Sequence, residues 1–301
     1  MKRANYKLLL SFFLLLLCGH VSVAQKKAPL RADWLAMDIA NLERILPQLK
    51  QNEPLTVAAL ERIFDSPGSN NHFDWIGRDK RLGYGAQTFV FSKSGGYTSL
   101  RVTGFVFNGT IGNYSITLHS LASWPRIKSV LVDTWNRNGG PEFTEAEDGL
   151  RHKREFASVI ADYKKAVADQ LGEMQPVNVP AQLKDGYELL ISPGKNSVVG
   201  QGGCGYGAVT PPGKEAIDAI VKAQRLDLLA NVLKGYNPGG RVYAAVALTA
   251  MQRKGVELPG DTLAALELVR NLDLRVETCE GCIFSFQTAK TIIDEWRFDM
   301  R

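Results

Sequence analysis

A glycine-rich stretch, GQGGCGYGAVTPPGK over residues 200–214, has the composition of a loop that could hold a phosphate group. Gly200, Gly202 and Gly205 have the spacing of a dinucleotide-binding fingerprint, in which the last glycine opens a helix. Two prolines at 211–212 separate these glycines from the helix that we expect to follow. The last glycine therefore does not open a helix, as the dinucleotide-binding fingerprint requires.

The same stretch also departs from the phosphate-binding pattern that ends in Gly-Lys-Ser/Thr. Gly207 and Gly213 are separated by five residues instead of four, and Lys214 is followed by Glu215, which would repel phosphate. We therefore expect no nucleotide or other cofactor here, and a turn-rich entry to a helix that begins near Pro212. Open backbone amides that contact a peptide or a glycan are an alternative.

Cysteines are the second concentration of chemically reactive groups. Cys204, Cys279 and Cys282 allow three single disulfides, each leaving one thiol over. The pair Cys279 and Cys282 also has the spacing of a redox site, which normally needs a helix N-terminus to lower the thiol pKa. Residues 283–286 predict a strand instead, and Glu280 would raise thiol pKa values, so we favour a structural disulfide over thiol-disulfide exchange.

Histidines and acids give no metal or catalytic pattern. His72, His119 and His152 are isolated in the sequence, whereas zinc needs about four ligands. No recognised motif of a metallopeptidase, an α/β-hydrolase or a calcium loop is present. We expect no metal and no catalytic residue, and the chain is more readily explained as a binding protein than as an enzyme.

The first 24 residues have the three parts of a secretory signal peptide. Lys2, Arg3 and Lys7 precede an almost entirely apolar run at residues 8–17, and small residues lead up to Ala24. The apolar run is shorter than a membrane span. We expect cleavage after Ala24 and a secreted or periplasmic protein.

Cys18 at the end of the apolar run could carry a lipid, but the preceding Leu15-Leu16-Leu17 lacks the small residue of the bacterial lipoprotein pattern. Removal of the leader, which has three basic and no acidic residues, lowers the formal charge from +5 to +2. So small an excess gives no field that would attract nucleic acid. No later segment is apolar and long enough to predict a membrane span.

The N-terminal half, residues 25–172, predicts helices followed by an antiparallel sheet. Leucines and isoleucines recur at helical spacing over residues 35–49, with Asp33 as N-cap and Pro47 as a kink or stop; a second helix follows Pro54. Short segments rich in β-branched and aromatic residues then predict strands. They are residues 87–92, 99–107, 114–119 and 127–132, punctuated by Gly95-Gly96, Asn108-Gly109 and Gly112-Asn113.

Residues 143–171 return to a helical pattern with one apolar side. Arg151, Lys153 and Arg154 are placed on its charged face, which is typical of a solvated helix surface. Residues 173–186 have two prolines and no periodicity, and we expect a linker there. The following domain, residues 187–301, is mainly helical, with strands at 274–279 and 282–286 and a last helix ending near Trp296.

Within this second domain, residues 226–251 form a pattern of two helices around a proline-containing turn. Pro238 in the turn, Arg241 at the start of the second helix, and the small or apolar residues Ala244, Ala245, Ala247 and Leu248 resemble a HEAT repeat. Gly240 stands where that family has a branched apolar residue, and Gly235 where it prefers aspartate. No further copies follow, so the resemblance implies one HEAT-like hairpin within a helical bundle, a packing unit often used to present protein-binding surfaces.

Together these patterns predict an α+β protein with a helix-plus-sheet domain and a mainly helical domain. We expect a non-catalytic binding protein for a protein or cell-envelope partner. The alternative is a thiol-disulfide oxidoreductase or other enzyme built on Cys279 and Cys282, with Cys204 as a third participant.

Overall fold

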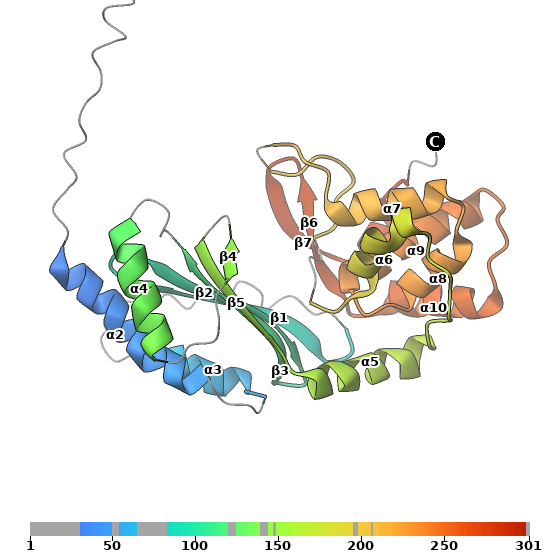
Figure 1. Ribbon diagram of the computed structural model, residues 1–301. Helices are drawn as coiled ribbons and strands as arrows, with labels where there is room; N and C mark the ends of the chain where they lie inside the picture. Colours follow the sequence, from blue (N-terminus) through green and yellow to red (C-terminus); the bar gives the residue numbers. More distant parts are fainter. Residues whose placement is uncertain are drawn as a thin grey trace, which may run out of the picture.

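The structure is a computed structural model (Figure 1). It describes residues 31–49, 54–64, 83–119, 125–138, 144–146, 149–194, 198–205 and 207–298. Within these ranges the chain combines helices with antiparallel sheets, so the predicted α+β class is confirmed. The predicted signal peptide, including Cys18, and His72 lie outside the described residues.

The larger sheet is antiparallel, with strand order β1-β2-β3-β5-β4. Its strands are β1 (Ala86–Ser94), β2 (Ser99–Phe107), β3 (Thr110–His119), β4 (Thr144–Ala146) and β5 (Gly149–Glu155). The predicted Asn-Gly hairpin is confirmed, because Asn108 and Gly109 join β2 to β3 with φ angles of 47° and 79°. Positive φ at both central residues is what a type I′ turn requires. Gly112 and Asn113 lie inside β3, where the register shifts at a bulge, and not between strands as expected.

Three helices cover one face of this sheet: α2 (Ala32–Leu49), α3 (Val57–Phe64) and α4 (Pro125–Arg137) (Figure 1). The first two were expected, and Leu42, Leu46 and Leu60 are buried against sheet residues as their spacing predicted. Asp33 lies in the first turn of α2 and does not precede the helix, and Pro47 is accommodated in its last turns.

Two predicted elements were wrong. Residues 127–132 are not a strand but part of α4, because Ile127, Leu131 and Trp135 recur at helical spacing and are all fully buried. Their β-branched neighbours had favoured a strand. Similarly, residues 143–171 are not one helix: β4 and β5 form first, and α5 (Ala157–Leu171) begins only after Phe156. The cations at 151, 153 and 154 therefore lie on a strand.

The C-terminal part is a helical bundle with a small two-stranded sheet. Its elements are η1 (Ala181–Leu183), α6 (Lys184–Ile191), α7 (Pro212–Lys222), α8 (Leu226–Leu233), α9 (Pro238–Arg253), α10 (Gly260–Asn271), β6 (Arg275–Glu280), β7 (Ile283–Thr288) and α11 (Ala289–Glu295). Helix α5 contributes Tyr163 and Val167 to the bundle core and Val159 to the core under the sheet. Residues 173–180 have no helix or strand, and the division into two domains at 173–186 stays a prediction.

Helix α9 lies at the centre of the bundle, and nearly all of its residues are buried. The helix begins where Asn237 caps it, with the side-chain oxygen accepting from the Gly240 N–H at 3.1 Å, and Pro238 occupies the first turn. Gly240 packs against the backbone of Leu190 in α6, and a Cβ atom would overlap the Leu190 carbonyl oxygen. The absence of a side chain at Gly240 therefore lets α6 and α9 approach closely.

Arg241, the next residue, is completely buried and donates to the carbonyl of Gly235 at 3.0 Å and to the hydroxyl of Tyr163 at 3.2 Å. Ala244, Ala245, Ala247 and Leu248 are equally buried. Small side chains permit this close helix packing. The two helices of the predicted hairpin are present, but its relation to HEAT repeats stays a prediction.

Candidate functional site

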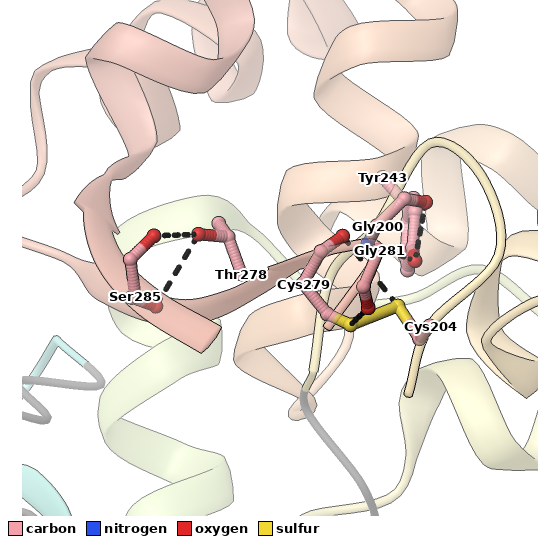
Figure 2. Close-up of a disulfide and its surroundings, with 7 residues drawn as sticks. All are labelled: Gly200, Cys204, Tyr243, Thr278, Cys279, Gly281 and Ser285. Atoms are coloured by element: carbon pink, nitrogen blue, oxygen red, sulfur yellow. Dashed lines mark hydrogen bonds between the residues drawn. A yellow bond between two sulfur atoms is a disulfide. The ribbon is translucent and has the colours of Figure 1, made fainter. Parts of the chain in front are cut away.

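The structure selects one of the three cysteine pairings that the sequence left open. Cys204 and Cys279, which are 75 positions apart in the sequence, form a disulfide with Cα atoms 5.7 Å apart (Figure 2). Cys282 has an exposed free thiol. An intramolecular disulfide is thus present, as expected, and it joins the glycine-rich loop to the β6–β7 hairpin.

The two predicted strands of the hairpin that carries Cys279 are present, but the turn between them is Gly281 and Cys282 instead of Glu280 and Gly281. Strands β6 and β7 pair antiparallel, with Glu280 opposite Ile283, and a two-residue turn connects them. Gly281 occupies the first turn position with a φ of 57°, the conformation that a type II′ turn requires. Across the strands the hydroxyl of Thr278 lies 2.8 Å from that of Ser285 (Figure 2).

The glycine-rich loop lies along β6 and is held by backbone hydrogen bonds. The Val199 N–H donates to the Glu277 carbonyl at 2.8 Å, and the Val199 carbonyl accepts from the Cys279 N–H at 2.9 Å. Further along, the Gly205 N–H donates to the Gly281 carbonyl at 2.8 Å. A phosphate-binding loop would direct its amides at a ligand, whereas these amides are already bonded to carbonyl oxygens.

Tyr243 fastens the start of this loop to the bundle core. Its hydroxyl accepts from the Gly200 N–H at 2.7 Å and donates to the Gly200 carbonyl at 3.1 Å (Figure 2). Burial is the main reason why the pKa of Tyr243 is raised above its ordinary value. The loop and the hairpin are therefore fixed by a covalent bridge at one point and by a buried tyrosine of α9 at another.

Three large apolar side chains near the bridge are exposed to solvent: Val209 at 63%, Ile283 at 71% and Phe284 at 54%. The backbone N–H and C=O groups of Val209 both form hydrogen bonds with the backbone of Cys204. Phe284 lies opposite Cys279 in the hairpin. We call these three residues the hairpin patch. Their exposure is unusual because other apolar residues of the bundle are mostly buried.

Strand β7 also presents backbone groups at its outer edge. In a two-residue hairpin the pair that flanks the turn is hydrogen-bonded, so Ile283 and Ser285 bond inward to β6. Phe284 lies between them, and its N–H and C=O point away from β6. Within the described residues no backbone partner for Phe284 is present.

Sequence reasoning missed this patch. It identified 282–286 as a strand but gave no sign that consecutive apolar residues there would face solvent. Ile283 and Phe284 point to opposite sides of β7, so burial of both would need cover on both faces. The available signal was the lack of apolar/polar alternation, which a half-buried strand normally shows.

The structure does not gather the histidines into a metal site. His119 and His152 lie on the neighbouring strands β3 and β5, but His152 pairs with Ile116, so the two side chains point to opposite faces. Among the described residues no group of three or more potential metal ligands converges. None of the described helices has the length and apolarity to cross a membrane.

Comparison with known proteins found no match to a protein-family model, to a curated protein or to a solved structure.

Proposed function

We propose that the chain is a non-catalytic binding protein of the extracellular or periplasmic space, and that the hairpin patch is its contact surface for a protein partner. One observation supports the proposal best: Ile283 and Phe284 are exposed on β7, the partner strand of β6, which a disulfide links to the 198–205 loop. Large apolar side chains that stay exposed on a rigid scaffold are candidates for contact with another protein.

The disulfide also supports the proposed location. Disulfides form and persist in oxidising compartments such as the periplasm and the extracellular space, and they are rare in the reducing cytosol. Cleavage after Ala24 would deliver the chain to such a compartment. Lipidation at Cys18 remains the less favoured alternative, and a nucleic-acid partner is not expected.

A matched pair of exposed apolar residues makes the proposal testable. A photo-crosslinking amino acid is placed at Phe284 or, as the control, at Leu268 of α10, because the two side chains are similarly exposed at 54% and 47%. Each purified variant is irradiated with a cell-envelope extract, and cross-linked proteins are identified by mass spectrometry. The proposal expects a partner that cross-links through position 284 but not through position 268.

The partner is then purified and its dissociation constant is measured by titration. Phe284→Ser should weaken binding at least tenfold, because an apolar anchor at the centre of a contact often contributes more than 1.4 kcal/mol. Leu268→Ser should leave the dissociation constant unchanged. Equal cross-linking at the two positions, or equal affinity of the two variants, would contradict the proposal.

A second candidate function rests on the free thiol of Cys282, which is exposed and lies three residues beyond Cys279. Its thiolate could attack the Cys279 sulfur, form a new Cys279–Cys282 bond and release the Cys204 thiolate. This exchange conserves electrons and needs no external oxidant. Peptide mapping in glutathione buffers of graded potential would support it if the Cys279–Cys282 bridge forms while the fold persists.

A further inference from the structure

The larger sheet has a second face, opposite to the one that α2, α3 and α4 cover. Side chains alternate between the two faces along a strand, and directly paired residues share a face. Thr103 pairs with Ser115, and Ser115 pairs with Lys153, whereas the neighbouring pair Val102 and Ile116 is buried under the helices. The second face is therefore polar where the first is apolar.

A cleft of about 550 Å³ lies over this polar face. Thr103, Ser115 and Lys153 line it from the sheet, while Gly194 and Glu277 line it from the C-terminal part. In Figure 1 the sheet lies on the side of the C-terminal part where β6 and β7 are placed. Clefts of roughly 300–1,000 Å³ with a few convergent polar groups are the usual sites for small ligands.

The polar face carries two rows of hydrogen-bond donors. Thr103, Ser115 and Lys153 form one row, with neighbouring side chains roughly 5 Å apart because they are directly paired. The next row, about 7 Å further along the strands, is Arg101, Thr117 and Arg151. These groups donate to oxygen atoms, and three of them are cations.

Two of these cations are not neutralised by the protein. Lys153 and Arg101 are exposed, and neither has an acidic partner in the described part of the chain. Arg151 is already engaged within the protein, because its Nε donates to the Thr117 hydroxyl at 3.4 Å. Lys153 is paired with Ser115, and Ser115 with Thr103, so one ammonium group and two hydroxyls lie in one row across the strands, and each can donate to an oxygen lone pair of an oxyanion.

Carboxylates at the margin of the cleft limit the charge of the ligand. Glu155 is exposed at the end of β5, and Glu277 lines the opposite wall. Two acids beside the cations favour a ligand with a single negative charge over a dianion, and they can accept hydrogen bonds from ligand hydroxyls.

From this arrangement we infer that the cleft binds a small sugar acid, with its carboxylate on Lys153 and Ser115 and its hydroxyls toward Glu155 and Glu277. The carboxylate matches the donor row, and the hydroxyl groups match the two acids. This site is separate from the hairpin patch and does not depend on a protein partner.

Isothermal titration of the purified protein with glucuronate, glucose and glucose 6-phosphate tests the inference. Glucuronate should bind measurably at 50 mM salt, and at least tenfold more tightly than either of the other two sugars. Because the pairing is electrostatic, raising the salt to 500 mM should weaken glucuronate binding severalfold.

Two variants locate the site, and one serves as a control. Lys153→Gln and Ser115→Ala should each weaken glucuronate binding, the first by at least tenfold. Lys222→Gln removes an equally exposed lysine from α7, away from the cleft, and should not change it. Circular dichroism verifies that each variant is folded, and Arg101→Gln on the rim provides a third test should Lys153→Gln unfold.

Several outcomes would overturn the inference. Tighter binding of glucose 6-phosphate would reject the carboxylate in favour of a phosphate. Equal binding of glucose, absence of glucuronate binding, or equal loss in Lys153→Gln and Lys222→Gln would reject the site itself.

Discussion

Tyr243 and Gly200 exchange two hydrogen bonds, one in each direction, although they are 43 residues apart. A single phenol thereby satisfies both backbone groups of a glycine that lies against Cys279, where a Cβ atom would come within 2.8 Å of the cysteine carbonyl oxygen. The loop that carries Cys204 is consequently positioned by the core of the bundle.

Tyr243→Phe should destabilise the protein without changing its shape. The change leaves the N–H and C=O of Gly200 buried without these partners, at a cost of about 2–4 kcal/mol in the free energy of unfolding. Urea denaturation measures this cost. Tyr84→Phe is the control, because the Tyr84 hydroxyl makes no such pair of bonds, and its loss should cost under about 0.5 kcal/mol.

Alkaline pH should destabilise the protein through its buried tyrosines. Burial raises the pKa of Tyr243, and also of Tyr84, Tyr114 and Tyr187, above the ordinary value of 10.0. Above about pH 10 the unfolded chain therefore loses phenol protons that the folded chain keeps, so the free energy of unfolding falls as pH rises. Urea titrations from pH 8 to 11 measure the slope.

Tyr243→Phe should make this alkaline slope shallower, because one of the contributing phenols is removed. An identical slope in the variant would mean that Tyr243 ionises equally in the folded and unfolded states. That result would contradict the buried position of its hydroxyl.

Loss of the disulfide should be costly because of the long chain segment that it closes. Because the cysteines are 75 positions apart, the chain-entropy relation gives about 4.5 kcal/mol, which Cys204→Ser/Cys279→Ser should remove. Cys282→Ser should leave stability unchanged. Alkylation before and after reduction, followed by peptide mass spectrometry, should modify Cys282 first and the other two only after reduction.

Gly240→Ala should disturb the contact between α6 and α9. The added methyl group would overlap the Leu190 carbonyl oxygen, so we expect a loss of about 1–3 kcal/mol in the free energy of unfolding. Gly260→Ala is the matched control, because a Cβ atom there meets nothing within 4 Å. Its effect should be neutral or stabilising by about 0.5 kcal/mol, and equal destabilisation by both changes would refute the packing argument.

Local patterns predicted the elements whose signals are short-range. Asn108-Gly109 fixed a hairpin because few residues tolerate positive φ at two successive positions, and the leucine spacing of α2 identified its buried side. The strand predicted at residues 127–132 was wrong. Its β-branched residues favour a strand, but every fourth residue of this segment is buried in the core, and that burial stabilises a helix. Tertiary packing there outweighed local propensity.

The candidate sites were less accessible to sequence reasoning, because both depend on pairing between distant segments. Lys153 joins Ser115 only through the register of β3 with β5, and β5 had been expected to be helical. The disulfide illustrates the same limit: three cysteines predicted a bridge, but only the contact of the 198–205 loop with β6 determined which two could meet.

The position of the disulfide also determines what a protease could release. The bridge encloses the segment from Cys204 to Cys279, which contains all of α7, α8, α9 and α10. A single cut in any loop of that segment opens a ring and leaves the fragments joined through sulfur. The nicked chain would migrate as one molecule on a non-reducing gel and separate into two after reduction. The bridge therefore keeps the hairpin attached to the bundle even after the backbone between them has been cut.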